Sequence, residues 1–100
     1  IIVIKIGIAM TVPKNTYGRI ASKSGLSSKY GIHVLGGVID RSYTDEIGVI
    51  LINSSNKSKE FKKHNKIAQL IITSVIPVKI MISKNLTIKS RGGGFGSTGI

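Results

Sequence analysis

The sequence lacks cysteine and tryptophan, and among its 100 residues it holds only two prolines, four acidic residues and five aromatic residues. The absence of cysteine excludes structural disulfides, thiolate zinc sites and cysteine nucleophiles. His33 and His64 are the only histidines, and two such side chains cannot form a metal cluster alone. No segment approaches the roughly 18 consecutive apolar residues of a membrane-spanning helix. We therefore expect one soluble domain with no metal ligands of its own.

Acidic residues are also scarce relative to basic ones. Fifteen lysines and arginines against four acids give a formal net charge of +11, and twelve of the fifteen cations are lysine. Lysine is a strongly hydrated point charge, so the surplus favours an anionic partner such as a nucleotide, a nucleic acid or an acidic membrane surface. A compositional bias toward Ile, Lys and Asn explains the same charge equally well.

The apolar residues favour strands. There are 19 isoleucines and 7 valines against 3 alanines and 5 leucines, and β-branched side chains suit a pleated surface. Short runs of them recur at spacings of roughly ten residues, a pattern typical of an all-β sandwich, jelly roll or barrel. Only Ser24–Lys29 is expected to form a helical turn. The expected strands are Ile2–Met10, Tyr17–Ala21, Ile32–Leu35, Val38–Ile39, Ile47–Ile52, Lys59–Lys62, Ile67–Val75, Val78–Ile82 and Leu86–Lys89.

The chain opens with IIVIKIGIAM and has no initiator methionine, so we expect a segment upstream of Ile1 to be missing. The opening stretch is too short to span a bilayer, contains Lys5, and lacks the basic region and cleavage site of a signal peptide. We expect a soluble intracellular protein, in the cytoplasm or nucleus, of viral or polyprotein origin.

Four segments carry residues suited to nucleotide chemistry. The tail RGGGFGSTG offers an arginine, a glycine run whose backbone N–H groups can face a phosphate, and Phe95 for a flat base. From composition alone, a flexible terminus is about twice as good an explanation. LGGVIDRSYTDEIGVILIN places Asp40 three residues before Tyr43, although an ordinary hairpin accounts for this as well. SKSGLSSKYG sets Ser24 at an expected helix start, and KIAQLII embeds Gln69 in an apolar strand.

In this order the segments resemble the trimeric dUTP pyrophosphatase (dUTPase) family, from about Ile2 to Gly99. VIKIGIAMTVPKNTYGRIASKSGLSSKYG resembles the family's second-motif region, GVIDRSYTDEIGVILIN its third motif, NKIAQLI its fourth and RGGGFGSTG its fifth. The resemblance implies a small jelly-roll-like, distorted β barrel that works as a homotrimer, with each active site assembled from three subunits. It divides the chain into a barrel domain, residues 1–90, and a tail, residues 91–100, that closes over the nucleotide.

The resemblance implies hydrolysis of dUTP to dUMP and pyrophosphate, which limits uracil in DNA. Asp40 matches the catalytic carboxylate that positions and deprotonates the attacking water. Tyr43 matches the tyrosine that lies against the deoxyribose and leaves no room for a 2′-hydroxyl, and the backbone of residues 37–39 matches the hairpin that binds uracil. Phe95 would cap the base and Arg91 would reach the terminal phosphate. The implied substrate-binding residues are Lys23, Ser24, Gly25, Gly37, Val38, Ile39, Tyr43, Gln69, Arg91, Gly94, Phe95, Gly96 and Ser97.

Several positions depart from the family pattern. The first motif, whose aspartate helps to hold the magnesium triphosphate, would precede Ile1. We therefore expect Mg²⁺ to be held mainly by the substrate phosphates. Lys23 stands where the family usually has arginine, and His-Asn-Lys at residues 64–66 replaces Gly-Asp-Arg before the fourth motif. The tail is one residue short between its arginine and its phenylalanine.

Two alternatives stay open beside dUTP hydrolysis. One is a truncated or degenerate dUTPase-like protein that binds nucleotide without efficient catalysis. The other is a small basic nucleic-acid-binding β barrel, which ranks lower because only five aromatic residues are available for base stacking. We expect dUTP and further copies of this chain as partners, and neither a specific nucleic acid nor a membrane.

Overall fold

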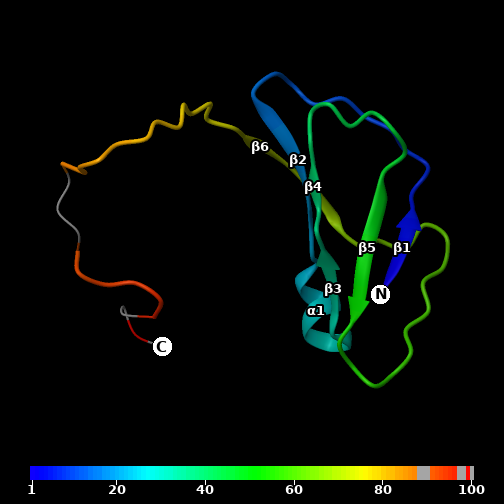
Figure 1. Ribbon diagram of the computed structural model, residues 1–100. Coiled ribbons are helices and arrows are strands. Elements are labelled where there is room, and N and C mark those ends of the chain that lie inside the picture. The colour runs from blue at the N-terminus through cyan, green and yellow to red at the C-terminus, as the bar shows by residue number, and fades with distance from the viewer. Residues whose placement is uncertain (88–90, 97–98, 100) are drawn as a thin grey trace.

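The computed structural model describes residues 1–87, 91–96 and 99 of the chain. In these residues six strands form two three-stranded antiparallel sheets, and one short helix lies at one end of them (Figure 1). The elements in chain order are β1 (Ile2–Lys5), β2 (Thr16–Ala21), α1 (Ser24–Tyr30), β3 (Ile32–Leu35), β4 (Val38–Ile39), β5 (Gly48–Asn53) and β6 (Gln69–Ser74).

The two sheets face each other across a small apolar core. One sheet has the strand order β1-β5-β3 and the other β4-β2-β6. Buried and half-buried residues alternate along most of β5, as they should on a strand with one face on the core. The buried apolar side chains of the described residues are Val12, Ile20, Ile32, Ile47, Val49 and Leu51. The expected all-β, jelly-roll-like class is confirmed.

A glycine pair carries the chain from one sheet to the other between β3 and β4. Gly37 has a φ of +96°, and a Cβ at this position would collide with the carbonyl oxygen of Ile20. The Ile20 N–H donates to the Gly37 carbonyl at 2.7 Å. Only glycine permits this close backbone approach, which fixes where β4 and the loop after it begin.

Helix α1 confirms the expected helical turn and extends it by one residue. It ends at Gly31, whose φ of +67° is the left-handed conformation common after helices. His33 on β3 then links the helix to the residue just after β5 through its two ring nitrogens. Its Nδ1 lies 3.0 Å from Ser27 Oγ on α1, and its Nε2 lies 3.2 Å from Ser54 Oγ just after β5.

Five of the nine expected strands are confirmed to within two residues at each end, and three others are wrong or shorter. The strand expected over Ile2–Met10 ends at Lys5, because Gly7 adopts a φ of +74° and donates its N–H to Glu46 Oε2 at 2.8 Å. Residues 59–62 and 78–82 form no strand. Strand propensity is expressed only against a partner edge, and neither segment pairs with one here. Of the strand expected at 86–89, residues 86–87 are irregular and residues 88–89 lie outside the described part.

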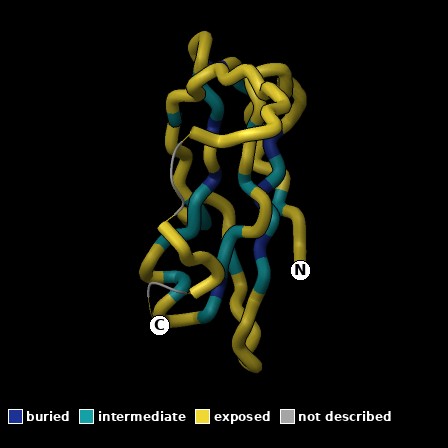
Figure 2. The backbone as a smooth tube through the Cα atoms, turned by 60° about the vertical axis from the view of Figure 1, so that its left-hand side comes forward, coloured by how far each residue is buried: buried dark blue, intermediate teal, exposed yellow. Residues whose placement is uncertain are grey.

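After β6 the chain leaves the sandwich and runs apart from it (Figure 1). The radius of gyration is 18.7 Å, whereas a compact chain of this length would have about 13 Å. Figure 2 shows the buried residues within the sandwich and the described part of the C-terminal segment exposed. Ile80 is 90% exposed and Ile82 is fully exposed. In the described residues no helix has the length and hydropathy needed to cross a membrane.

Candidate active site

Asp40 follows β4 directly, and its carboxylate is held by the two residues after it. Oδ1 accepts the Arg41 N–H at 2.9 Å, and Oδ2 accepts the Ser42 hydroxyl at 2.7 Å. The Tyr43 N–H donates to the Asp40 carbonyl oxygen at 3.0 Å, which closes the turn. The side chain of Asp40 is exposed, so each oxygen keeps a lone pair for a water or a ligand.

This carboxylate borders a cavity of about 430 Å³. Its lining residues come from the turn after β4 and from the segment between β1 and β2, and they are Thr11, Val12, Asp40, Arg41 and Ser42. Of these, the sequence predicted only Asp40. The rule that Asp bonds the residues that follow it in a turn would have found Ser42, but no local signal points to Thr11 or Val12.

The side chain of Tyr43, three residues after Asp40, is held in place by a hydrogen bond from its hydroxyl. The hydroxyl donates to the Glu46 carbonyl oxygen at 2.6 Å, and the side chain is 37% exposed. Glu46 in turn accepts the Gly7 N–H through Oε2. The tyrosine therefore belongs to a braced loop, residues 40–46, and does not rotate freely in solvent.

A second group of predicted residues gathers around the start of α1. Ser24 and Gly25 are the first two helical residues, and Lys23 precedes them with no side-chain cap bond at this helix end. Gln69, the first residue of β6, donates through Nε2 to the Ser22 carbonyl oxygen at 2.9 Å. The structure therefore brings Gln69 next to the segment that enters α1.

The two groups do not meet within one chain. The register of β4 on β2 puts Asp40 at the level of Tyr17, whereas Gln69 pairs with Ala21. Four residues along β2 correspond to about 13 Å, and β4 and β6 lie on opposite sides of β2, about 10 Å apart. The carboxylate and the α1 group are thus separate sites on one chain.

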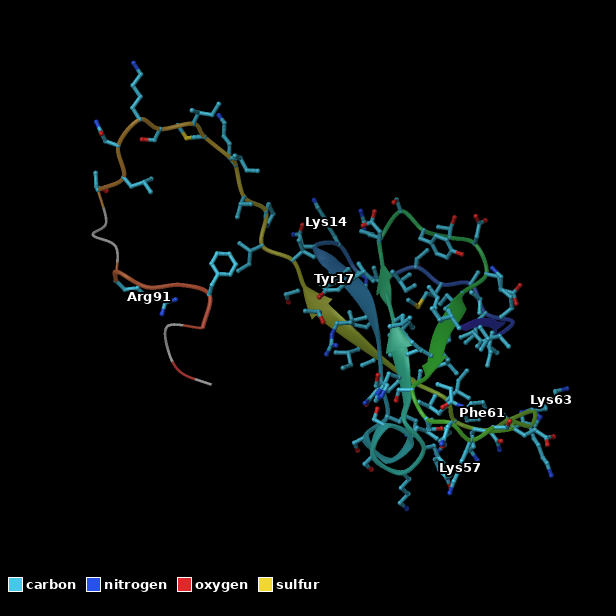
Figure 3. The ribbon with its side chains drawn as sticks, turned by 60° about the horizontal axis from the view of Figure 1, so that its bottom comes forward. Lys14, Tyr17, Lys57, Phe61, Lys63 and Arg91 are labelled. Carbon is cyan, nitrogen blue, oxygen red and sulfur yellow. The ribbon has the colours of Figure 1, made fainter. Side chains whose placement is uncertain are left out.

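The tail residues form a third group that stands away from both. Figure 3 shows Arg91 far from the sandwich and from Tyr17. Phe95 is fully exposed and has a φ of +42°. Gly94 and Gly96 flank it in the same segment, and Ser97 lies outside the described residues. The described tail residues, 91–96 and 99, close over neither of the other groups.

Similarity to known proteins extends along nearly the whole chain. A sequence model of dUTPase matches residues 1–99. The chain belongs to the dUTPase family. A deoxyuridine 5′-triphosphate nucleotidohydrolase of Paramecium bursaria Chlorella virus 1 is 47% identical over 100 residues, which cover 99% of this chain and 71% of that protein. The enzyme of the same name from Kluyveromyces lactis is 46% identical over 97 residues, or 95% and 66% of the two chains.

The chain thus spans about two thirds of the length of the curated dUTPases it matches. Among solved structures, the Staphylococcus bacteriophage 80alpha dUTPase with dUPNHPP superposes with a TM-score of 0.81 at 25% identity, covering 99% of this chain and 76% of that one. A dUTPase mutant from phage phi11 of S. aureus, solved for its structural Mg(II) ion, superposes with a TM-score of 0.74 at 21% identity, covering 87% and 74%. The expected family and fold are therefore confirmed.

The substituted tripeptide at 64–66 keeps a glycine-like backbone at its first residue. His64 has a φ of +73°, although a β-carbon makes this region costly. Asn65 Oδ1 accepts the Lys62 N–H at 2.8 Å, and the Asn65 N–H returns to the Lys62 carbonyl oxygen at 3.0 Å. The turn at residues 62–65 is thus closed by Asn65, with His64 in the left-handed region.

The described residues do not assemble a metal site from protein ligands. Across residues 1–87, 91–96 and 99, no three His, Cys, Asp or Glu side chains lie close enough together to hold an ion. Asp40 is braced by a hydrogen bond at each oxygen, and no second carboxylate lines its cavity. These residues fit a metal only if its other ligands come from elsewhere.

Proposed function

We propose that this chain hydrolyses dUTP to dUMP and pyrophosphate. The observation that carries the proposal is Asp40, a braced and exposed carboxylate on a cavity of about 430 Å³, at the position of the catalytic aspartate of the dUTPase third motif. Relatives at 46–47% identity are named for this activity.

Asp40 would act as the general base. Its carboxylate accepts a proton from a bound water, and the water oxygen attacks the α-phosphorus of dUTP. The bond from that phosphorus to the bridging oxygen of the β-phosphate breaks, so pyrophosphate leaves and dUMP remains. A positioned base of this kind typically contributes about 10²–10⁴-fold to the rate. The bonds from the Arg41 N–H and the Ser42 hydroxyl keep the carboxylate aimed and limit its rotation.

The other residues divide into base, sugar and phosphate contacts. The backbone of Gly37, Val38 and Ile39 would bind uracil, and the ring of Tyr43 would pack on the deoxyribose. The phosphate contacts would come from both the α1 region and the tail, while Phe95 covers the base. The proposed phosphate-side residues are Lys23, Ser24, Gly25, Gln69, Arg91, Gly94, Gly96 and Ser97.

We further propose that a homotrimer completes the site. In one chain the Asp40 turn, the α1 group and the tail lie apart (Figures 1 and 3). Three copies around one axis can bring the Asp40 turn of one subunit to the α1 group of a second and the tail of a third. The apolar segment exposed after β6 supports this proposal, because assembly would cover it. Residues 1–90 would form the barrel and residues 91–100 the closing tail.

Magnesium would arrive with the substrate. Since the described residues supply no cluster of carboxylates, the phosphate oxygens and water would provide most of its ligands. The bound ion would offset the negative charge of the triphosphate. Asp40, Tyr43 and the backbone of residues 37–39 would act on the nucleotide itself.

The test replaces the carboxylate by an amide. In Asp40→Asn, pyrophosphate release from dUTP is expected to fall by about 10²–10⁴-fold, while binding of a non-hydrolysable dUTP analogue stays within about threefold, because the amide keeps the shape. Asp45→Asn is the matched control: it removes the same charge from the same loop and should leave the rate unchanged. Undiminished hydrolysis in Asp40→Asn would refute the assignment. A wild-type chain that binds dUTP without releasing pyrophosphate would establish the nucleotide-binding alternative.

A further inference from the structure

The loop between β5 and β6 concentrates positive charge that the proposed reaction does not use. Half of residues 57–66 are lysine, with Glu60 as the only acid. Helix α1 ends beside this loop and adds Lys29 in its last turn. In Figure 3, Lys57, Phe61 and Lys63 lie together at one end of the molecule, away from Arg91. We define the basic patch as Lys29, Lys57, Lys59, Lys62 and Lys63.

The loop that carries the patch is ordered although it has no strand. The Asn53 Nδ2 donates to the Lys57 carbonyl oxygen at 2.7 Å, and Asn53 Oδ1 accepts the Ser55 N–H at 2.9 Å. Near its far end, the turn closed by Asn65 holds Lys62. These bonds hold the backbone in place, so an incoming ligand meets lysines whose backbone positions are already set and bears less of the cost of ordering the loop.

Aromatic rings stand among the lysines. The Lys59 Nζ lies 4.5 Å from the centroid of Tyr30 and 5.6 Å from that of Phe61. Tyr30 is 44% exposed and borders a small cavity of about 70 Å³ with Lys29, Lys57 and Lys59. An exposed ring surrounded by cations is the combination with which proteins hold single-stranded nucleic acid, since bases stack while lysines contact phosphates.

The patch is separate from the Asp40 cavity. Strand β5 begins after the loop of residues 40–46 and ends at Asn53, where the patch loop begins (Figure 1). Six strand residues span about 17–20 Å. A ligand on the patch therefore lies at the opposite end of β5 from the Asp40 turn.

We propose that the basic patch binds single-stranded nucleic acid without sequence preference. The lysines contact phosphates as point charges, and one base stacks on Tyr30, taking the place of the Lys59 ammonium. An anionic membrane fits less well, because Phe61, the only apolar side chain in residues 54–66, is half-buried, so the loop itself has little to insert among lipids. Exposed Ile1 and Ile2 border the same cavity as Lys59 and Phe61, and vesicle binding is therefore measured as well. Binding of this kind is independent of sequence and requires no specific nucleic-acid partner.

The experiment compares two triple variants of the full chain that lower the net charge equally. The patch variant is Lys57→Gln with Lys59→Gln and Lys63→Gln, and the control is Lys14→Gln with Lys79→Gln and Lys84→Gln. Binding of a fluorescent oligothymidine is followed by anisotropy as the salt concentration is raised. The patch variant should lose at least about tenfold in affinity. Each lost phosphate contact lowers the magnitude of the slope of log K against log salt by about 0.7, so the loss of three contacts should lower it by about 2. The control should change less than about threefold.

Tyr30 provides a second, uncharged test. Tyr30→Ala should weaken oligothymidine binding by about tenfold, because base stacking is lost, and Tyr30→Phe should keep it. Equal losses in the two triple variants would overturn the proposal in favour of diffuse net charge. Patch-dependent binding to phosphatidylserine vesicles that exceeds binding to the oligonucleotide would replace it by a membrane site.

A competition assay separates this proposal from the reaction. Excess non-hydrolysable dUTP analogue should leave the oligonucleotide bound, and its displacement would assign the binding to the candidate active site and refute a separate patch. Pyrophosphate release measured on the same samples reports on the proposed hydrolysis independently. Oligonucleotide binding by the patch and hydrolysis of dUTP can therefore each be refuted without affecting the other.

Discussion

At the scale of single residues, the bond from the Tyr43 hydroxyl to the Glu46 carbonyl sets the position of the ring proposed to exclude ribose. Tyr43→Ala removes the ring and should reduce the ratio of kcat/KM for dUTP over UTP on the order of tenfold or more, because a 2′-hydroxyl then has room. Tyr43→Phe keeps the ring, loses only the hydroxyl bond, and should retain the ratio within about threefold. Steady-state kinetics with both nucleotides measure this, and an unchanged ratio in Tyr43→Ala would show that another group reads the sugar.

His64 adopts a backbone conformation that its β-carbon disfavours. Its φ of +73° costs a residue with a β-carbon roughly 1–2 kcal/mol, and glycine removes that cost while losing about 0.5–1 kcal/mol in chain entropy. His64→Gly should therefore raise the free energy of unfolding by about 0.5–1 kcal/mol, as measured by urea denaturation. Lys63→Gly, at a neighbouring residue outside the positive-φ region, should lower it. A loss of stability in His64→Gly would mean that the imidazole contributes contacts worth more than the strain.

At the scale of elements, the described part of the tail makes no contribution to the core. Phe95, the one large apolar side chain among the described tail residues 91–96 and 99, is fully exposed. Deleting residues 91–100 should leave the circular dichroism spectrum and the unfolding midpoint nearly unchanged. Hydrolysis of dUTP should nevertheless fall roughly 10²-fold or more, because the donors and the ring that close the site are gone. Full activity in the deletion variant would favour a flexible terminus.

The two segments wrongly expected to be strands show what a local pattern leaves out. Val78–Ile82 is as rich in β-branched residues as β5, yet it has no partner edge in this chain and stays extended and exposed. The segment 59–62 is instead flanked by turns that asparagine side chains stabilise. Strand formation requires a neighbour, and sequence periodicity contains no information on whether one is present.

At the scale of the whole molecule, the core is too small for the apolar surface that the chain carries. Among the described residues six apolar side chains are buried, whereas Ile76, Val78, Ile80, Ile82 and Leu86 are each at least 80% exposed. Burial of such a side chain stabilises by about 1.5–3 kcal/mol, so association should be strongly favoured. Light scattering should give three times the chain mass of 10.7 kDa.

Ile82→Asp should shift that assembly toward smaller species, because a charge would be buried without a partner. Asn85→Asp adds the same charge to the same segment at a polar position and should leave the mass unchanged. A monomer at micromolar concentration in the wild type would contradict the proposed trimer and leave the Asp40 turn without a phosphate site.

The sequence by itself determined the strand-rich class, the short helix at Ser24 and the family. The first two depend on local physics, because runs of β-branched residues between turn-forming residues favour short strands. The order of motifs along the chain also identified Asp40 without reference to any distance.

Only the tertiary structure decided which of these residues can act together. It joined Thr11 and Val12 to Asp40 in one cavity, set Gln69 beside the start of α1, and placed both Asp40 and the tail apart from that group. It also gathered Lys29, Lys57 and Lys59 around Tyr30. The physical reason is that strand pairing and register bring together residues far apart in sequence, and they depend on the fit of whole faces rather than on local sequence.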